Sequence, residues 1–111
     1  MSDKRFSIIT KDFEQCLVCG SYLGIHKHEI FFGRKNRELS IKYGLVVPLC
    51  HRHHNGSNFG VHNKNGHVLD MKLKKLGQEA FEHHYPDLNF LKIFGRNYLW
   101  DTTNIAIKKW K

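Results

Sequence analysis

Two closely spaced pairs of potential metal ligands constrain the fold of this chain more than any other feature. Cys16 and Cys19 are separated by two residues, and Cys50 and His53 have the same spacing. At this spacing both side chains of a pair can reach one ion, while backbone N–H groups of the turn face the thiolates. The two pairs together form a Cys3His set, which predicts a structural Zn²⁺ bound by these four residues.

The expected zinc site suits the small size of the protein. The chain has 111 residues, 41% of them hydrophobic, so one compact domain with a small core is expected. Metal binding then adds to the free energy of folding. An odd number of cysteines in a reducing compartment favours metal ligation over disulfides. Two alternatives are free thiols packed as small hydrophobic side chains, and His51 in place of His53 as the fourth ligand.

Charge and hydropathy narrow the classes of partner. Lysine and arginine total 18 against 10 aspartates and glutamates, a formal net charge of +8. This balance favours a polyanionic partner, with nucleic acid first. No apolar run approaches the ~20 residues of a membrane span. The N-terminal stretch lacks the apolar segment of a signal peptide. We therefore expect a cytoplasmic protein without a membrane partner.

Apolar patterning predicts an α+β fold. Residues 6–9 form one expected short strand, "YLGIHKHEIFF" one or two strands, and "LVVPLC" a further strand that Pro48 ends or places at an edge. Residues 33–44 are expected to form a basic loop with at most a helical turn at 38–42. A short helix can begin after Cys50.

The clearest expected helix covers residues 69–84. Its apolar side chains recur at helical spacing and predict one buried face, and Pro86 ends the pattern. The expected face consists of Leu69, Leu73, Leu76, Ala80 and Phe81.

A second group of side chains that can bind metal lies close to the two ligand pairs in the sequence. "HKHEI" places His26 and His28 on one face of the expected strand and Glu29 on the other. A helix beginning near His54 would place His54 and Asn58 on one face, and His62 follows. A strand histidine that deprotonates water, facing helix ligands that hold a divalent ion, is a workable nuclease site. The competing interpretation is a set of ordinary surface histidines.

The order of these motifs resembles the HNH endonucleases. The similar stretches are "CLVCG", "IHKHEIFFG", "NRELSIKYGLVVPLCHRHHNGS" and "GVH", with further similarity in "LKKLGQEAFE" and "IFGRNYL". They are most similar to a small phage-encoded group that resembles the recombination enhancement nuclease. The resemblance covers about residues 16–99. It implies a single HNH-like domain over 1–111, with a zinc-stapled ββα-metal core, an additional C-terminal helix, and peripheral segments at 1–13 and 100–111.

The resemblance also implies roles for individual residues. His28 corresponds to the general base, and His54 to a ligand of the catalytic divalent ion, Mg²⁺ or another. Asn58 or His62 would complete the set of ligands, and His26 is a further candidate.

The sequence departs from the HNH pattern at two places. Lys27 stands where many HNH enzymes have a histidine or aspartate. Gly44 lies about where the asparagine of the HNH name is expected. If the base aligns one residue later, Glu29 is the base and His28 becomes a metal ligand.

The basic stretch "GRKNR" follows the expected catalytic strand. Arg34, Lys35 and Arg37 are candidate phosphate contacts, or else charges of a solvated loop. No segment resembles a base-reading helix, so we expect hydrolysis of DNA with low sequence specificity. The resemblance implies phage recombination or DNA processing in the host cytoplasm, with a recombinase filament as one candidate partner.

Two other functions compete with the nuclease. One is a catalytically inactive, zinc-containing DNA-binding accessory protein, which the two departures favour. The other is a zinc protein that binds another protein, which predicts no salt-dependent affinity for DNA.

Overall fold

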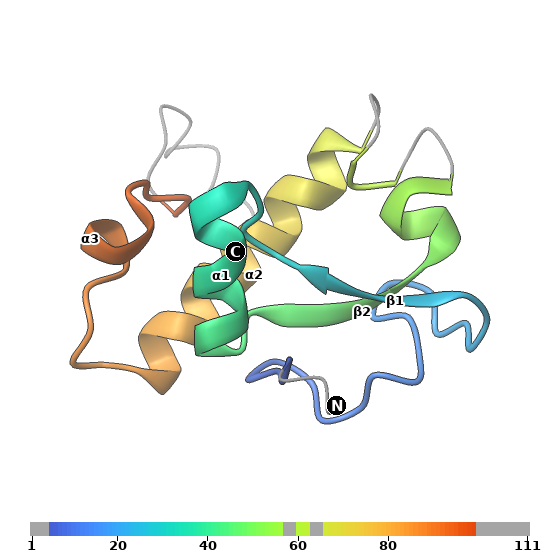
Figure 1. Ribbon diagram of the computed structural model, residues 1–111, viewed down its shortest axis with the longest axis horizontal. Coiled ribbons are helices and arrows are strands. Elements are labelled where there is room, and N and C mark those ends of the chain that lie inside the picture. Colours follow the sequence, from blue (N-terminus) through green and yellow to red (C-terminus); the bar gives the residue numbers. More distant parts are fainter. Residues whose placement is uncertain (1–4, 57–59, 63–65, 100–111) are drawn as a thin grey trace, which may run out of the picture.

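In the computed structural model, two antiparallel strands form the centre of the fold. The structure describes residues 5–56, 60–62 and 66–99. Figure 1 shows the strands side by side across the middle of the molecule, with η1 and α3 toward opposite ends. The elements are β1 (Ile25–Glu29), α1 (Arg34–Tyr43), β2 (Val46–Cys50), the π-helix η1 (Arg52–Gly56), α2 (His67–His84) and α3 (Phe90–Phe94). The α+β class expected from the sequence is confirmed.

The register of the sheet positions the histidines of β1. His28 lies opposite Val47 and His26 opposite Leu49, while all five residues of β2 are buried. Pro48 lies in the middle of β2, and its carbonyl accepts a hydrogen bond of 2.8 Å from the N–H of Leu17. Proline tolerates this position because β2 pairs with only one strand in the described sheet. This hydrogen bond holds the turn that carries Cys16 and Cys19 next to β2.

The expected loop over residues 33–44 was wrong, because α1 occupies most of this stretch. The buried Ser40 hydroxyl donates to the Phe31 carbonyl at 2.8 Å and accepts from the Phe31 N–H at 3.0 Å. Gly44 ends the helix with a φ of 76°. Half of the helix residues are exposed, and the apolar side chains that pack against the core, Leu39 and Tyr43, lie in its second half, so the sequence lacks the long apolar stripe that predicts a helix.

The expected strand at residues 6–9 was also wrong. The Ser7 hydroxyl accepts hydrogen bonds from the N–H groups of Ile9 and Thr10, which makes a turn. The Ile8 N–H donates to the Gly44 carbonyl at 2.9 Å. This segment is therefore held against the end of α1 without joining the sheet.

The expected helix at 69–84 is confirmed as α2, which begins two residues earlier, but its buried face differs. Leu76 is 38% exposed. The buried residues of the helix are Asp70, Leu73, Gly77, Gln78 and Phe81. Gln78 is buried because its amide oxygen accepts from the Tyr98 N–H at 2.7 Å and its nitrogen donates to Asn97 at 3.1 Å. Burial here follows from tertiary hydrogen bonds, which hydrophobic periodicity does not report.

Aromatic side chains fill the space between β1, α2 and α3. The ring centroid of Phe31 lies 5.2 Å from that of Phe90, 4.9 Å from that of Phe94 and 5.2 Å from that of Tyr98. Phe81 of α2 contacts the same group, with its centroid 5.4 Å from that of Phe90. This core fixes α2 relative to β1. No described helix is long and apolar enough to cross a membrane.

Candidate metal centres

The two cysteine-containing pairs meet at one point. One ligand atom from each of Cys16, Cys19, Cys50 and His53 lies within 4.8 Å of the other three. The measured separations are 3.8 Å between the Cys19 and Cys50 sulfurs, and 3.3 and 3.7 Å from His53 Nδ1 to the Cys50 and Cys16 sulfurs. Ligands around one tetrahedral Zn²⁺ lie about 3.5–3.8 Å apart. The set is therefore compatible with a structural zinc.

Local backbone geometry favours the thiolate form of Cys16. The turn is closed by hydrogen bonds from the Gly20 N–H to the Cys16 carbonyl and from the Cys16 N–H to the Ser21 carbonyl. Burial opposes ionisation of Cys16, but backbone hydrogen bonds from Cys50, Cys19 and Val18 outweigh it and lower the pKa of its thiol to about 6. The thiolate is the form that binds metal.

The fourth position belongs to His53, and the alternative His51 lies elsewhere. His51 is exposed, and its ring centroid lies 5.6 Å from that of His26. Cys50 ends β2 and η1 begins two residues later, so the second pair spans the junction between a strand and a helical turn.

A second cluster consists of His28, His54 and His62. One ring nitrogen from each lies within 4.8 Å of the other two. His28 comes from β1, His54 from η1, and His62 from the segment that follows. Backbone hydrogen bonds from Val61 to the His53 carbonyl and from His62 to the His54 carbonyl return this segment to η1. A histidine of β1 thus meets two histidines of a later stretch of the chain at one site.

The histidines in and beside the cluster differ in their hydrogen-bond partners. His54 and His62 approach through their Nε2 atoms, 3.1 Å apart. His26 contacts His54 on its other nitrogen, with 2.7 Å between the two Nδ1 atoms. His28 is only 1% exposed, and its Nε2 has no hydrogen-bond partner among the described residues.

The electrostatics of the cluster favour the neutral forms of His28 and His54. Burial, followed by the neighbouring His54 and His62, lowers the pKa of His28 to about 3. Burial and the nearby His62 and His26 lower the pKa of His54 to about 4. Neutral imidazole is the form that binds a metal ion or accepts a proton. The cluster fits a divalent ion, since its ring nitrogens converge and one of them is buried without a partner.

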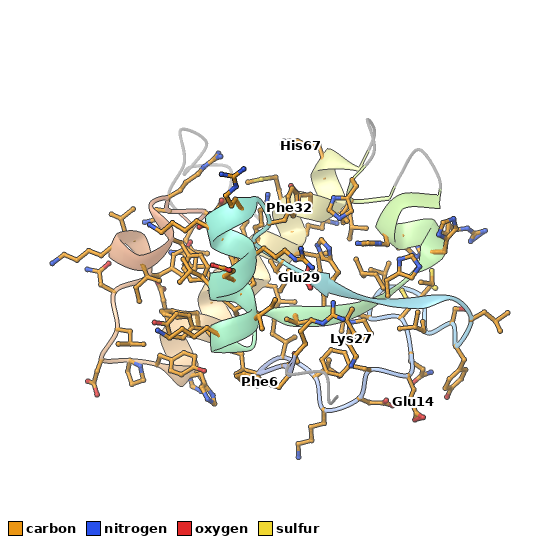
Figure 2. The ribbon with its side chains drawn as sticks, in the orientation of Figure 1. Phe6, Glu14, Lys27, Glu29, Phe32 and His67 are labelled. Carbon is orange, nitrogen blue, oxygen red and sulfur yellow. The ribbon has the colours of Figure 1, made fainter. Side chains whose placement is uncertain are left out.

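Glu29 lies apart from this cluster, as strand alternation predicts. Its carboxylate accepts from Arg5 Nη1 at 2.9 Å and lies 3.5 Å from Arg37 Nε. Lys27 also lies away from the cluster, with its ammonium 5.1 Å from the centre of the Phe13 ring (Figure 2). Asn58, the other expected ligand, lies outside the described residues.

The expected phosphate contacts lie on a helix instead of a loop. Arg34, Lys35 and Arg37 occupy the first turn of α1, and all three are exposed. Arg34 and Arg37 line a shallow hollow together with Gly33, Glu38 and Ile41. Arg37 also pairs with Glu29, which leaves Arg34 and Lys35 as the more accessible cations of the turn.

Sequence reasoning missed the residues of α2 next to the histidines. Lys74 Nζ lies 2.9 Å from Asp70 Oδ2 and 4.2 Å from the centre of the Phe32 ring. The Phe32 ring lies 4.8 Å from that of His62 and 5.9 Å from that of His28. The one local signal was the i,i+4 spacing of Asp70 and Lys74, which is common on helix surfaces.

Comparison of the chain with protein-family models, with curated proteins and with solved structures found no match. Function is therefore argued from the two centres and their surroundings.

Proposed function

We propose that this protein is a metal-dependent endonuclease of the HNH type that hydrolyses DNA phosphodiester bonds with low sequence specificity. The observation that carries the proposal is the convergence of His28 from β1 with His54 and His62 from the segments that follow β2. β1 and β2 pair antiparallel and η1 follows β2, which resembles the strand–strand–helix order of a ββα-metal core, although α1 lies between the strands and η1 is a single π-helical turn.

His28 has the properties of the general base. Burial lowers the pKa of its imidazole and favours the neutral form, and its Nε2 has no hydrogen-bond partner among the described residues, so it can carry the lone pair in the Nδ1–H tautomer. A phosphate anion close to the ring would raise its pKa toward a useful range. Glu29, the alternative base, is engaged by two arginines on the opposite side of the strand.

His54 and His62 have the properties of ligands for the catalytic divalent ion. Their Nε2 atoms face each other at 3.1 Å, so both can reach one ion. An ion bound there would lower the pKa of a water molecule and polarise the phosphoryl oxygens. His26 holds the far nitrogen of His54 at 2.7 Å and thereby fixes the orientation of the ring.

The first turn of α1 supports DNA as the substrate. Arg34, Lys35 and Arg37 lie at the helix end where the backbone dipole is positive, and no acidic residue in that turn offsets them. Cations are unfavourable there by about 0.3–1 kcal/mol each, and an anion is favourable. A DNA phosphate bound at this end would remove the repulsion, and α1 begins five residues after the end of β1.

The test is nicking of supercoiled plasmid by the zinc-containing protein with added Mg²⁺ or Mn²⁺. His28→Ala should lower the rate about 10²-fold or more, because the proton acceptor is lost. The matched control His83→Ala changes an exposed histidine of α2 and should nick like the wild type.

Metal affinity separates the two possible roles of His28. As a base, its replacement by alanine should leave Mn²⁺ binding unchanged, whereas His54→Ala should weaken it. Equal loss of Mn²⁺ binding in both variants would contradict the assignment and make His28 a ligand.

The second candidate function is an inactive DNA-binding accessory protein. The orientation of Lys27 favours it, because this residue directs its ammonium toward Phe13 and supplies no ligand to the cluster. Absence of nicking with any divalent ion, combined with DNA affinity that falls steeply with salt, would support this function over the first.

A further inference from the structure

A lysine of α2 lies beside the histidine cluster and has no role in the reaction described so far. Lys74 Nζ is 4.2 Å from the centre of the Phe32 ring, and Phe32 in turn contacts the rings of His62 and His28. Figure 2 shows Phe32 between the start of α1 and α2. Its ring, 37% exposed, is thus contacted by both the lysine and the histidines at the edge of the cluster.

The position of Lys74 is fixed from two sides. Its ammonium lies 2.9 Å from Asp70 Oδ2, one helical turn earlier, and over the face of the Phe32 ring. The two charged side chains are only 14% and 12% exposed. An ammonium carries three N–H donors, and Asp70 occupies one of them. Lys74 is thus an oriented cation with donors to spare.

The buried ion pair of Lys74 with Asp70 contributes little net stability to a small domain. Charges withdrawn from water lose solvation that a single partner restores only in part, so apolar residues of similar size often stabilise equally well. Asp70 Oδ1 is buried and has no hydrogen-bond partner among the described residues, which adds to the cost. A costly ion pair next to a candidate metal centre indicates a functional requirement at this place.

We propose that Lys74 is a further catalytic residue, which donates a hydrogen bond to a non-bridging oxygen of the scissile phosphodiester. Negative charge increases on these oxygens as the water attacks, so a pre-oriented cation stabilises the transition state more than the bound substrate. Lys74 transfers no proton in this step. Asp70 acts through Lys74 as a positioning residue. The inference rests on the proposed function and adds a residue to the same site.

The variant that tests it is Lys74→Met, which removes the charge and keeps most of the side-chain volume. Its matched control is Lys72→Met on the exposed side of the same helix. Cleavage of a labelled DNA duplex in Mn²⁺ should show kcat lowered about 10²-fold in Lys74→Met with KM changed much less. Lys74→Arg, which retains a cation, should recover part of the loss. Zinc content and circular dichroism should match the wild type in all three proteins.

Equal kcat in Lys74→Met and Lys72→Met would overturn the inference, as would failure of Lys74→Arg to recover any activity. If Lys74→Met does not fold, the Lys74→Gln and Lys72→Gln variants are compared with the same expectations.

The outcome in which the wild type does not cleave DNA separates this inference from the proposed function. Binding of inorganic phosphate to the Mn²⁺-loaded protein is then measured from the broadening of the phosphorus NMR signal. Broadening that is present in the wild type and Lys72→Met but lost in Lys74→Met would reject the nuclease and retain Lys74 as a phosphate ligand. Equal broadening, or none, in the two variants would reject Lys74 as well.

Discussion

Neighbouring histidines of η1 serve two different centres. His53 Nδ1 lies 3.3 Å from the Cys50 sulfur, whereas His54 Nε2 lies 3.1 Å from that of His62. Successive side chains of a helical turn point in different directions, so one turn can supply a ligand to each of two sites. The role of each histidine is therefore set by its neighbours: thiols around His53, imidazoles around His54.

This division predicts opposite consequences for two substitutions. Cys16→Ser should lose the zinc and with it most of the helical signal, because binding free energy contributes directly to folding. His54→Ala should keep the zinc and the fold while it loses most of the cleavage. Metal analysis and circular dichroism of both purified proteins check this. Similar loss of helical signal in the two variants would contradict the division.

His26 gives a prediction about orientation. Because its Nδ1 holds the Nδ1 of His54 at 2.7 Å, His26→Ala should weaken the apparent affinity for the catalytic ion about 10- to 100-fold. The zinc content should stay the same. The concentration of Mn²⁺ that half-activates cleavage measures the effect, with His67→Ala at the exposed start of α2 as control. An unchanged half-activating concentration would remove His26 from the site.

Among the elements, the corner between α1 and β2 is formed by a glycine with a positive φ. Gly44 has a φ of 76°, and a Cβ atom there would clash with Cε2 of Phe6 and lie 3.0 Å from Cγ2 of Ile8. Gly95 ends α3 with a φ of 80°, but a Cβ there would meet no described atom within 4 Å. The two glycines form a matched pair that separates backbone strain from steric clash.

We therefore expect unequal costs for two alanine substitutions. Gly95→Ala should lower the free energy of unfolding by about 1–2 kcal/mol, the cost of a left-handed residue with a side chain. Gly44→Ala should lower it by about 1–3 kcal/mol more, because residues 6–8 must move. Denaturant melts of the zinc-loaded proteins measure both. Equal destabilisation would mean that the N-terminal segment does not pack against this corner.

The structural elements also show which features could be predicted from the sequence and which could not. Ligand spacing is local, so the Cys3His set and the side of β1 that carries His26 and His28 followed from the sequence. α1 did not, because half of its residues are exposed and its apolar contacts with the core come from Leu39 and Tyr43 in its second half. Lys74 was missed because its contact with Phe32 joins residues 42 positions apart and depends on how α2 packs against the sheet.

The domain as a whole couples its two centres through η1. The candidate zinc ligands Cys50 and His53 flank the start of this element, and His54 lies within it. Zinc removal should therefore disorganise the histidine cluster as well as the fold, whereas removal of the catalytic ion should leave the fold intact.

Two chelation experiments test this asymmetry. A chelator strong enough to remove thiolate-bound zinc should abolish cooperative unfolding and cleavage together, and zinc should restore both. A brief treatment that removes only Mg²⁺ or Mn²⁺ should abolish cleavage alone. Calorimetry of the treated proteins is the measurement. A zinc-free protein that still unfolds cooperatively at an unchanged temperature would show that the fold does not need the metal.

The most direct test of two centres with separate tasks is cleavage of plasmid DNA by protein that contains one zinc per chain, measured against the concentration of added Mg²⁺ or Mn²⁺. We expect no nicking without added ion, a saturable rise in the nicking rate with it, and a constant zinc content and circular dichroism spectrum throughout. Cleavage that proceeds at full rate with zinc alone, or no cleavage at any concentration of either ion, would contradict the assignment of separate tasks to the two centres.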